Sequence, residues 1–454
     1  MIFFFLLIAV MPLEEHRVWT HVIGDLTVIK YLGVACVLAA LVHLGVRRTT
    51  PRYLQTAQAK CFLLLFLLAT VSYFTKSLRF SFEVSPWTSY VGFALLFFIV
   101  ISMVDSIARL RWTALATLGS VTLASLYVIR FWQKYGDPRP GGTTGDANYY
   151  TISALVGVPL GLYLISERRP RWSPLYCLGC LAITLIGIVL ASSRGGLFGL
   201  AMSVLLMVWH SRRRARNLAL AAVLLIPPLL AFPISPLRRM LHPGTADTIS
   251  THEHLAAWRA GLRMIATHPI LGVGLGNFKP LMLGYLPQGV SMAEPSIAHN
   301  TYIEFAAELG LPGLLLFLCI LYFCYRDTGR VAARFKESGQ TLLNRVALGI
   351  QAGLVAYSVS AFFLSAEYEK LFWLIVFLSA CVSALAKSEN DKADTRPTRL
   401  TSHGLKSVTV EPAGALQSAV QRQSFAQRAP GNAATAVKRT QIRRTALFGT
   451  GRTN

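Results

Sequence analysis

Long apolar segments constrain this chain more than any other feature of its sequence. Segments such as VIKYLGVACVLAALVHLGV, WTSYVGFALLFFIVISMV and WTALATLGSVTLASLYVI have roughly the 20 residues that a helix needs to cross a bilayer. Hydrophobic residues make up 54% of the 454 residues and charged residues only 14%. Because a backbone in lipid must satisfy its own hydrogen bonds, the sequence predicts an all-α integral membrane protein.

Hydropathy indicates about twelve membrane spans. They lie near 1–12, 24–46, 59–75, 87–105, 112–132, 147–166, 173–191, 195–210, 217–234, 311–326, 343–364 and 370–386. The first segment resembles a signal peptide, but it lacks a basic start and a small-x-small cleavage site, so we interpret it as a retained span. The spans define a transmembrane domain over residues 1–386.

Lysine and arginine are concentrated in every second connection, which predicts the orientation of the helices. The basic connections contain Arg47, Arg48, Arg52 and Lys60; Arg109 and Arg111; Arg168, Arg169 and Arg171; Arg212, Arg213, Arg214 and Arg216; Arg326, Arg330, Arg334, Lys336 and Arg345. Both termini are therefore expected in the cytoplasm. The net charge of +23 comes mostly from these loops and from a basic tail at 387–454, so it does not indicate a nucleic-acid partner. The tail has few large apolar residues and is predicted to be disordered.

One outer loop, at 235–310, is far longer than the other connections, and loops of this length are usually functional. Its segment THEHLAAWRAGLRMIATHP is predicted to be a helix that ends at Pro269, with Arg259 and Arg263 four residues apart on one face. The following ILGVGLGNF has glycines at Gly272, Gly274 and Gly276. These glycines fit either a bend pressed against helices or a backbone nest for phosphate.

The segment AHNTYIEFAAELGLPG, residues 298–313, closes the loop. Thr301 and Glu304 have the spacing of a capping box, and Gly310 with Pro312 ends a helix. The sequence therefore predicts a short helix on the outer surface at 301–309 and a new span from 311. His299 precedes this helix without a structural role that demands histidine, and a neutral imidazole can act as a general base.

Four further residues are candidates for the same site. Asn300, Glu304 and Glu308 share a helical stripe because they are spaced by four residues. Glu304 is explained largely by the cap, whereas Glu308 either supports the site or pairs with a loop arginine. In SSRGG, residues 192–196, a tight outer turn presents Arg194 either as a snorkelling side chain or as a bidentate ligand for an anion.

Metal and nucleotide chemistry are not indicated. The sequence has no acidic cluster in an outer loop, no Walker loop and no dinucleotide fingerprint, and the spacing of His252 and His254 does not suit a metal on a helix. We therefore expect no metal and no cofactor, so the energy for any transfer would arrive in the substrate.

Three separated motifs resemble one family. SSRGG, then W…HPILGVGLGNF, then AHNTYIEFAAELGLPGLLLF occur in this order over residues 190–325. This pattern is similar to the O-antigen ligase and polymerase superfamily of bacterial inner membranes. The resemblance implies a helical transferase of the polyprenyl-donor type. Such an enzyme moves a glycan from undecaprenyl pyrophosphate to an acceptor at the periplasmic face, with inversion and without metal.

The resemblance also implies roles for particular residues. His299 would deprotonate the acceptor hydroxyl, Arg194 would hold the donor pyrophosphate, and Arg259 or Arg263 would be a second phosphate ligand. Asn300, Glu304, Glu308, Gly274 and Gly276 would support the site. The family often has an arginine about one turn before the loop tryptophan, where this chain has His254.

We favour an O-antigen ligase with lipid A–core oligosaccharide as acceptor, because no further domain follows the last span apart from the tail. An O-antigen polymerase or a pilin oligosaccharyltransferase would use similar chemistry. A transporter is the alternative from another class, suggested by about twelve spans. Against transport, no broken helices recur in the two halves and ionisable residues are scarce inside the spans.

Overall fold

The computed structural model describes residues 1–13, 28–47, 52–76, 78, 85–137, 139–231, 236–242, 244–290, 292, 294–336 and 341–394. These residues form helices and turns, with no strand among them. The helices are α1 (Ile2–Val10), η1 (Met11–Leu13), α3 (Val28–Arg47), η2 (Arg52–Gln55), α4 (Ala57–Lys76), α5 (Pro86–Met103), α6 (Ile107–Tyr135), α7 (Ala147–Leu164), α8 (Ser173–Ala191), α9 (Arg194–His210), α10 (Arg214–Ala231), α11 (Pro236–Leu241), α12 (Thr245–Thr267), α13 (Phe278–Leu281), η3 (Met282–Tyr285), α14 (Thr301–Arg334), α15 (Thr341–Ser360) and α16 (Lys370–Asp394).

The predicted all-α membrane class is confirmed. Within the described residues, eight helices are long and apolar enough to cross a membrane: α3, α4, α5, α6, α8, α14, α15 and α16. The predicted spans at 1–12 and 195–210 coincide with the shorter apolar helices α1–η1 and α9. Those predicted at 147–166 and 217–234 coincide with α7 and α10, which are helical but are not among the eight.

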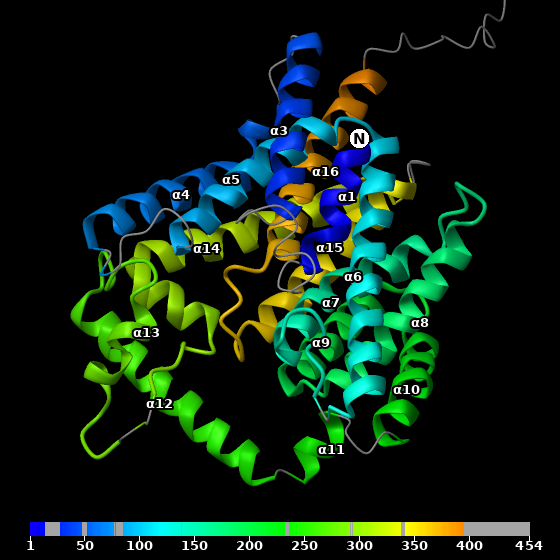
Figure 1. The fold of residues 1–454 in the computed structure, drawn as a ribbon. Coiled ribbons are helices and arrows are strands. Elements are labelled where there is room, and N and C mark those ends of the chain that lie inside the picture. Colours follow the sequence, from blue (N-terminus) through cyan, green and yellow to red (C-terminus); the bar gives the residue numbers. More distant parts are fainter. Residues whose placement is uncertain are drawn as a thin grey trace, which may run out of the picture. The chain divides into compact units, whose positions relative to one another are not determined.

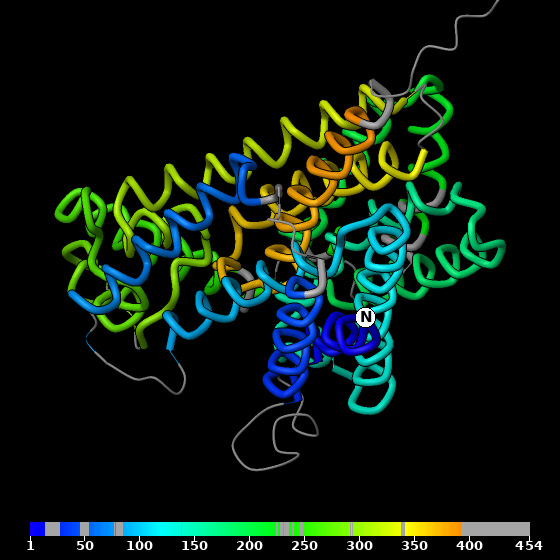
Figure 2. The backbone as a smooth tube through the Cα atoms, turned by 90° about the horizontal axis from the view of Figure 1, so that it is seen from above, coloured from blue at the N-terminus to red at the C-terminus, as the bar shows by residue number. Residues whose placement is uncertain are grey.

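Aromatic side chains of α4, α5 and α16 form the densest part of the core. The Phe62 ring lies 5.2 Å from Trp373 and 4.9 Å from Phe377, and Phe93 stacks on Trp373 at 5.4 Å, all between ring centroids. Helix α14 packs against α4 and α16, and α15 packs against α7 and α9. Figure 2 shows α14, in yellow-green, running beside α4, in blue. This packing fixes the starts of α7, α9 and α14, where the candidate site lies.

The long predicted loop contains the helices α11, α12 and α13 and a small apolar core of its own. Figure 1 shows α12 leading from α11 towards α13. Ala257, Ala260 and Met264 of α12 are buried against Phe278 and Ala307. Helix α12 ends at Thr267, two residues before Pro269, so the predicted helix is confirmed.

Helix α14 is broken at Gly310, whose φ of 70° and ψ of −178° are not helical. A side chain there would collide with the Ile270 carbonyl, so glycine is required at this position. The predicted break is confirmed, and the predicted position of 301–309 at the outer side of the membrane stays a prediction. Phe305 stacks on Phe317 with centroids 4.3 Å apart, and α14 is packed by α4, α12 and α16. Its first turns are therefore buried.

The predicted capping box is wrong, because the N-cap of α14 is Asn300. The Asn300 side chain accepts hydrogen bonds from the backbone N–H groups of Tyr302 and Ile303, at 3.0 and 3.1 Å. Thr301 is engaged elsewhere: its hydroxyl donates to the Leu364 carbonyl at 2.7 Å and accepts from the Ala366 N–H at 2.8 Å. Residues from the α15–α16 connection thus determine where α14 begins.

The predicted boundary between domain and tail falls inside a helix. Helix α16 continues to Asp394, past the expected end of the last span at 386. The rest of the predicted tail, 395–454, lies outside the described residues.

Candidate functional site

Arg194 is the first residue of α9 and lies half-buried beside a turn of unusual conformation. Ser192 ends α8 with a φ of 53°, and the Ser193 hydroxyl accepts a hydrogen bond from the Gly196 N–H at 3.2 Å. The predicted tight turn at 192–196 is therefore shorter than expected, because Arg194, Gly195 and Gly196 already belong to the helix. A side chain at Gly196 would collide with Thr151 of α7, so this glycine serves close helix packing.

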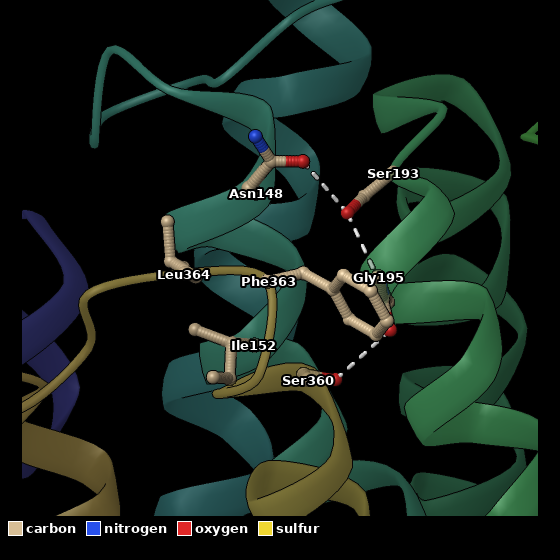
Figure 3. A pocket seen from close by; sticks show the side chains of 8 residues that line it. Asn148, Ile152, Ser193, Gly195, Ser360, Phe363 and Leu364 are labelled. Carbon is tan, nitrogen blue, oxygen red and sulfur yellow. Dashed lines mark hydrogen bonds between the residues drawn. The ribbon is translucent and has the colours of Figure 1, made fainter. Parts of the chain in front are cut away.

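A small cavity lies at the start of α9 (Figure 3). Its empty volume, which includes open solvent, is about 210 Å³, and it is lined by Asn148, Ile152, Ser193, Gly195, Gly196, Ser360, Phe363 and Leu364. The Ser193 hydroxyl donates to the Asn148 side-chain carbonyl at 2.8 Å, and Ser360 donates to the Gly195 carbonyl at 3.2 Å. The rim next to Arg194 is therefore polar and held by side chains of three segments.

His299 lies immediately before α14 in a left-handed backbone conformation, with a φ of 49°. Among the described residues, His299 and Ser192 are the two non-glycine residues with positive φ. This conformation costs energy and persists where the surroundings enforce it, often at functional sites. Asn300 enforces it from one side by capping α14, and Glu304 from the other by accepting a hydrogen bond from the Ala298 N–H.

The His299 ring stacks on His254 of α12. The ring centroids are 4.2 Å apart and the planes are inclined by 16°. On its edge, the Nε2 of His299 lies 3.2 Å from the Ser296 hydroxyl. Arg194 is close enough to lower the pKa of His254. Arg194, His254 and His299 thus meet at one place, and we call them the basic cluster.

Burial keeps both imidazoles neutral near pH 7, and at His254 the nearby Arg194 and His299 add to this effect. Burial lowers the pKa of His254 to about 4, with help from His299 and Arg194. Burial also lowers the pKa of His299, although Asp146 and Glu253 act in the opposite direction. A neutral imidazole can accept a proton, so His299 has the protonation state that a general base needs.

Arg259 and Arg263 are not brought to the basic cluster. At 100° per residue they lie about 140° and about 180° around α12 from His254. Both side chains are exposed, and Arg263 donates to the Leu286 carbonyl at 2.8 Å. The face of α12 that carries His254 points at the start of α14, because a side chain at Gly261 on that face would collide with Ile303.

The glycine-rich segment is a buried turn whose backbone N–H groups are all used inside the protein. Those of residues 272–278 donate to His268 O, Ala307 O, Glu308 O, Ser72 Oγ, Glu308 Oε2, Gly274 O and Glu308 Oε1 in chain order. Gly274 and Gly276 have φ of 108° and 78°, and side chains there would meet Lys76 and Pro86. This geometry is that of the bend against helices and leaves no N–H group for a phosphate nest.

The acidic residues of α14 have structural partners. Glu308 accepts from the N–H groups of Gly276 and Phe278 at 2.9 and 3.0 Å, rather than pairing with an arginine as one expectation had it. Glu304 accepts from the Ser365 hydroxyl as well as from Ala298. Glu367 of the α15–α16 connection is buried near both, and burial raises its pKa to about 8. We call Glu304, Glu308 and Glu367 the carboxylate cluster.

Sequence reasoning missed the contribution of His254. Its place one turn before Trp258 marked it as a departure from the family pattern, but nothing local indicated that it would stack on His299. Ser296 and Asn148 carry no sequence motif and are found from their contacts. Among the described residues, no group of three His, Cys, Asp or Glu side chains is arranged to hold a metal ion.

Residues 179–318 match the model of the O-antigen ligase family. The match contains the basic cluster, the glycine-rich segment and the first turns of α14. No curated protein matches the chain. The family match confirms the resemblance to the O-antigen ligase and polymerase superfamily without distinguishing its members. It supports a glycosyltransferase-like enzyme of the O-antigen ligase or polymerase type, acting on lipid-linked glycans in a membrane.

Proposed function

We propose, with the O-antigen ligase family match over residues 179–318 as the premise, that this protein is an O-antigen ligase. It transfers a glycan from undecaprenyl pyrophosphate to lipid A–core oligosaccharide, without metal or nucleotide, at the periplasmic face of a Gram-negative inner membrane. The observation that carries the proposal is the basic cluster, in which the candidate base His299 and the candidate anion ligand Arg194 meet through His254.

His299 acts as the general base. When its Nε2–H donates to the Ser296 hydroxyl, 3.2 Å away, the lone pair on Nδ1 is left to accept the proton of the acceptor hydroxyl. The hydroxyl oxygen then attacks the anomeric carbon of the donor sugar as the bond to pyrophosphate breaks, which inverts that carbon. General base catalysis of this kind typically contributes about 10²–10⁴ in rate.

Arg194 stabilises the leaving group. Charge develops on the pyrophosphate as the glycosidic bond breaks, so a guanidinium held in place binds the transition state more tightly than the ground state. Arg194 also begins α9, and the positive end of a helix dipole favours an anion at this position. Together these features supply the positive charge that a divalent metal provides in other transferases.

Orientation and lipid binding follow from the same proposal. The basic cluster faces the periplasm, with both termini in the cytoplasm, as the distribution of Lys and Arg in the sequence suggests. The undecaprenyl chain lies between apolar helices beside the start of α9. Membrane lipids and lipid A–core are then the other partners of the enzyme.

Reconstitution of the purified full chain in lipid nanodiscs tests the proposal. The protein is mixed with an undecaprenyl-pyrophosphate glycan and lipid A–core, with chelator and without nucleotide, and the product is followed by its mobility on a gel. We expect transfer under these conditions. Loss of transfer on adding chelator, or full activity of His299→Ala, would overturn the mechanism.

A change of acceptor separates the ligase from its relatives. In this test a second molecule of glycan-linked undecaprenyl pyrophosphate replaces lipid A–core. A ligase does not lengthen the glycan under these conditions, whereas an O-antigen polymerase joins the two glycans into a longer one. With pilin as the acceptor, only a pilin oligosaccharyltransferase gives a glycoprotein. Transfer to either of these acceptors, and none to lipid A–core, would replace the ligase by the corresponding activity.

A further inference from the structure

His254 lies against the proposed base, and a cation acts on it. Its ring is stacked 4.2 Å from His299, and Arg194 lowers its pKa. A proton on His254 would therefore face a guanidinium and a second imidazole. Burial, His299 and Arg194 hold His254 neutral near pH 7, although among the described side chains of α12 it is the basic one that reaches the cluster.

The charged and titratable groups around the stacked pair of His254 and His299 come from several segments. They are Arg194 at the start of α9, His299 before α14, Asp146 at the start of α7 and Glu253 on α12 itself. The two carboxylates act on His299. Of the other groups on packed elements, Glu304 is engaged with Ala298 and Ser365, and Tyr285 of η3 with His268 at the far end of α12. Among the described residues, the charged and titratable groups that act on His254 itself are the basic Arg194 and His299.

An unsatisfied donor lies one turn further along the same face. Trp258 is about 40° around α12 from His254, and its indole N–H is buried with no hydrogen-bond acceptor among the described residues. A buried donor without an acceptor costs free energy and points to a partner that binds there. A ligand rich in oxygen atoms would satisfy both the indole N–H and a protonated His254.

We propose that His254 is a proton-switched ligand of the donor's diphosphate, which is neutral before the diphosphate binds and protonated once a diphosphate lies against Arg194. The inference rests on the proposed function and deepens it. The diphosphate neutralises the field of Arg194 and gives the imidazolium an acceptor, both of which favour the charged ring. The proton comes from water on binding and returns to water when the diphosphate product leaves, so no other bond changes.

Calorimetry on the full chain in nanodiscs tests this switch. Binding of farnesyl diphosphate is measured at pH 7 in two buffers with different ionisation enthalpies, which gives the number of protons taken up. We expect the wild type to take up about one proton more per bound diphosphate than His254→Gln. His254→Arg, which carries the charge permanently, should bind the diphosphate without this additional uptake.

Two matched variants assign the proton to His254. His299→Gln should retain the additional uptake, as should His252→Gln, which changes an exposed histidine of the same helix. The inference is overturned if His254→Gln or His254→Arg takes up as many protons as the wild type, or if His299→Gln abolishes the difference. Binding that is unaffected by Arg194→Ala would instead contradict the donor site in the proposed function, so the two failures are distinguishable.

Discussion

The basic cluster and the carboxylate cluster lie at opposite ends of the same short segment, yet their polar groups are held in opposite ways. Glu308 accepts two backbone hydrogen bonds from the glycine-rich turn, and Glu304 accepts from Ala298 and Ser365. His299, only a few residues away, sits in a left-handed conformation with its ring against a second imidazole. The carboxylates accept hydrogen bonds from the protein itself, whereas the basic cluster brings a guanidinium and two neutral imidazoles together.

This difference separates polar residues that hold the site in shape from those that would contact a ligand. Buried polar groups with internal partners stabilise a fold, whereas strained backbone and buried donors without acceptors mark places where a ligand completes the structure. Glu304 and Asn300 position His299 by fixing the residues on either side of it. Substitutions in the two clusters should therefore change different quantities: activity in the basic cluster and stability in the carboxylate cluster.

The largest effect is expected for His299→Asn. Asparagine tolerates the left-handed conformation, so the loop keeps its shape while the base is lost. Glycan transfer should fall by about 10²–10⁴-fold with an unchanged melting temperature, measured as initial rates and by thermal unfolding in detergent. His268→Asn at the end of α12 is the control and should retain full activity. A His299→Asn protein that is equally active would place the base elsewhere.

Arg194→Lys is expected to have the next largest effect. Lysine keeps the charge but loses the planar, bidentate geometry that suits phosphate, so the rate should fall by about 10²–10³-fold without loss of stability. Initial rates of transfer measure this change. Arg216→Lys, on the exposed surface of α10, is the matched control. Equal rates for both variants would show that Arg194 does not stabilise the leaving group.

Glu308→Gln tests the carboxylate cluster. The amide can accept from only one of the two N–H groups that Glu308 now satisfies at Gly276 and Phe278. We expect a loss of about 1–3 kcal/mol in the free energy of unfolding, measured by denaturation in detergent. The activity of the folded fraction should stay within a few-fold of wild type. A specific loss of activity in a protein of normal stability would contradict the structural role.

Glu367→Gln should change how stability depends on pH. The folded-state pKa of Glu367 is about 8, against an ordinary value of 4.5, so between these values the unfolded chain loses a proton that the folded protein keeps. Wild-type stability should therefore fall as the pH rises through this range and level off above it. Glu367→Gln removes this contribution, so its melting temperature should be clearly higher than that of the wild type at pH 9 and equal to it at pH 4.

Exposed Glu294 provides the control for that measurement. Glu294→Gln should follow the wild-type curve at every pH. If the Glu367→Gln and wild-type curves are also parallel between pH 4 and pH 9, the carboxyl of Glu367 titrates in the folded protein as it does in water. The carboxylate cluster would then not be closed to solvent.

Local patterns in the sequence predicted the helices and their breaks. Apolar segments placed the twelve expected spans on helices, and Gly310 and Pro269 ended helices where their backbone chemistry requires it. The N-cap of α14 was displaced from Thr301 to Asn300 because the Thr301 hydroxyl binds residues 364 and 366. Contacts of such high sequence separation leave no trace in a motif of a few residues.

The sequence predicted the kinds of side chain in the candidate site, but not the full set of residues that form it. His299 and Arg194 carry residue types that fit their proposed roles, and both lie in the basic cluster. The glycine-rich segment could not be assigned from sequence, because its partners Ser72, Lys76 and Glu308 come from two other helices. Helical periodicity placed Arg259 and Arg263 on one face, but it could not tell which face meets α14.

Arg259→Ala is the smallest expected effect and the strictest test of how α12 is oriented. Because Arg259 is exposed and lies about 140° from His254 around the helix, its removal should change the transfer rate by less than about 2-fold, within the range of an ordinary surface substitution. His254→Ala on the opposite face should weaken diphosphate binding clearly. If Arg259→Ala instead matches the loss seen for Arg194→Lys, the second phosphate ligand is this arginine. The start of α12 must then turn towards α9 when the donor binds, and His254 would leave its stack on His299.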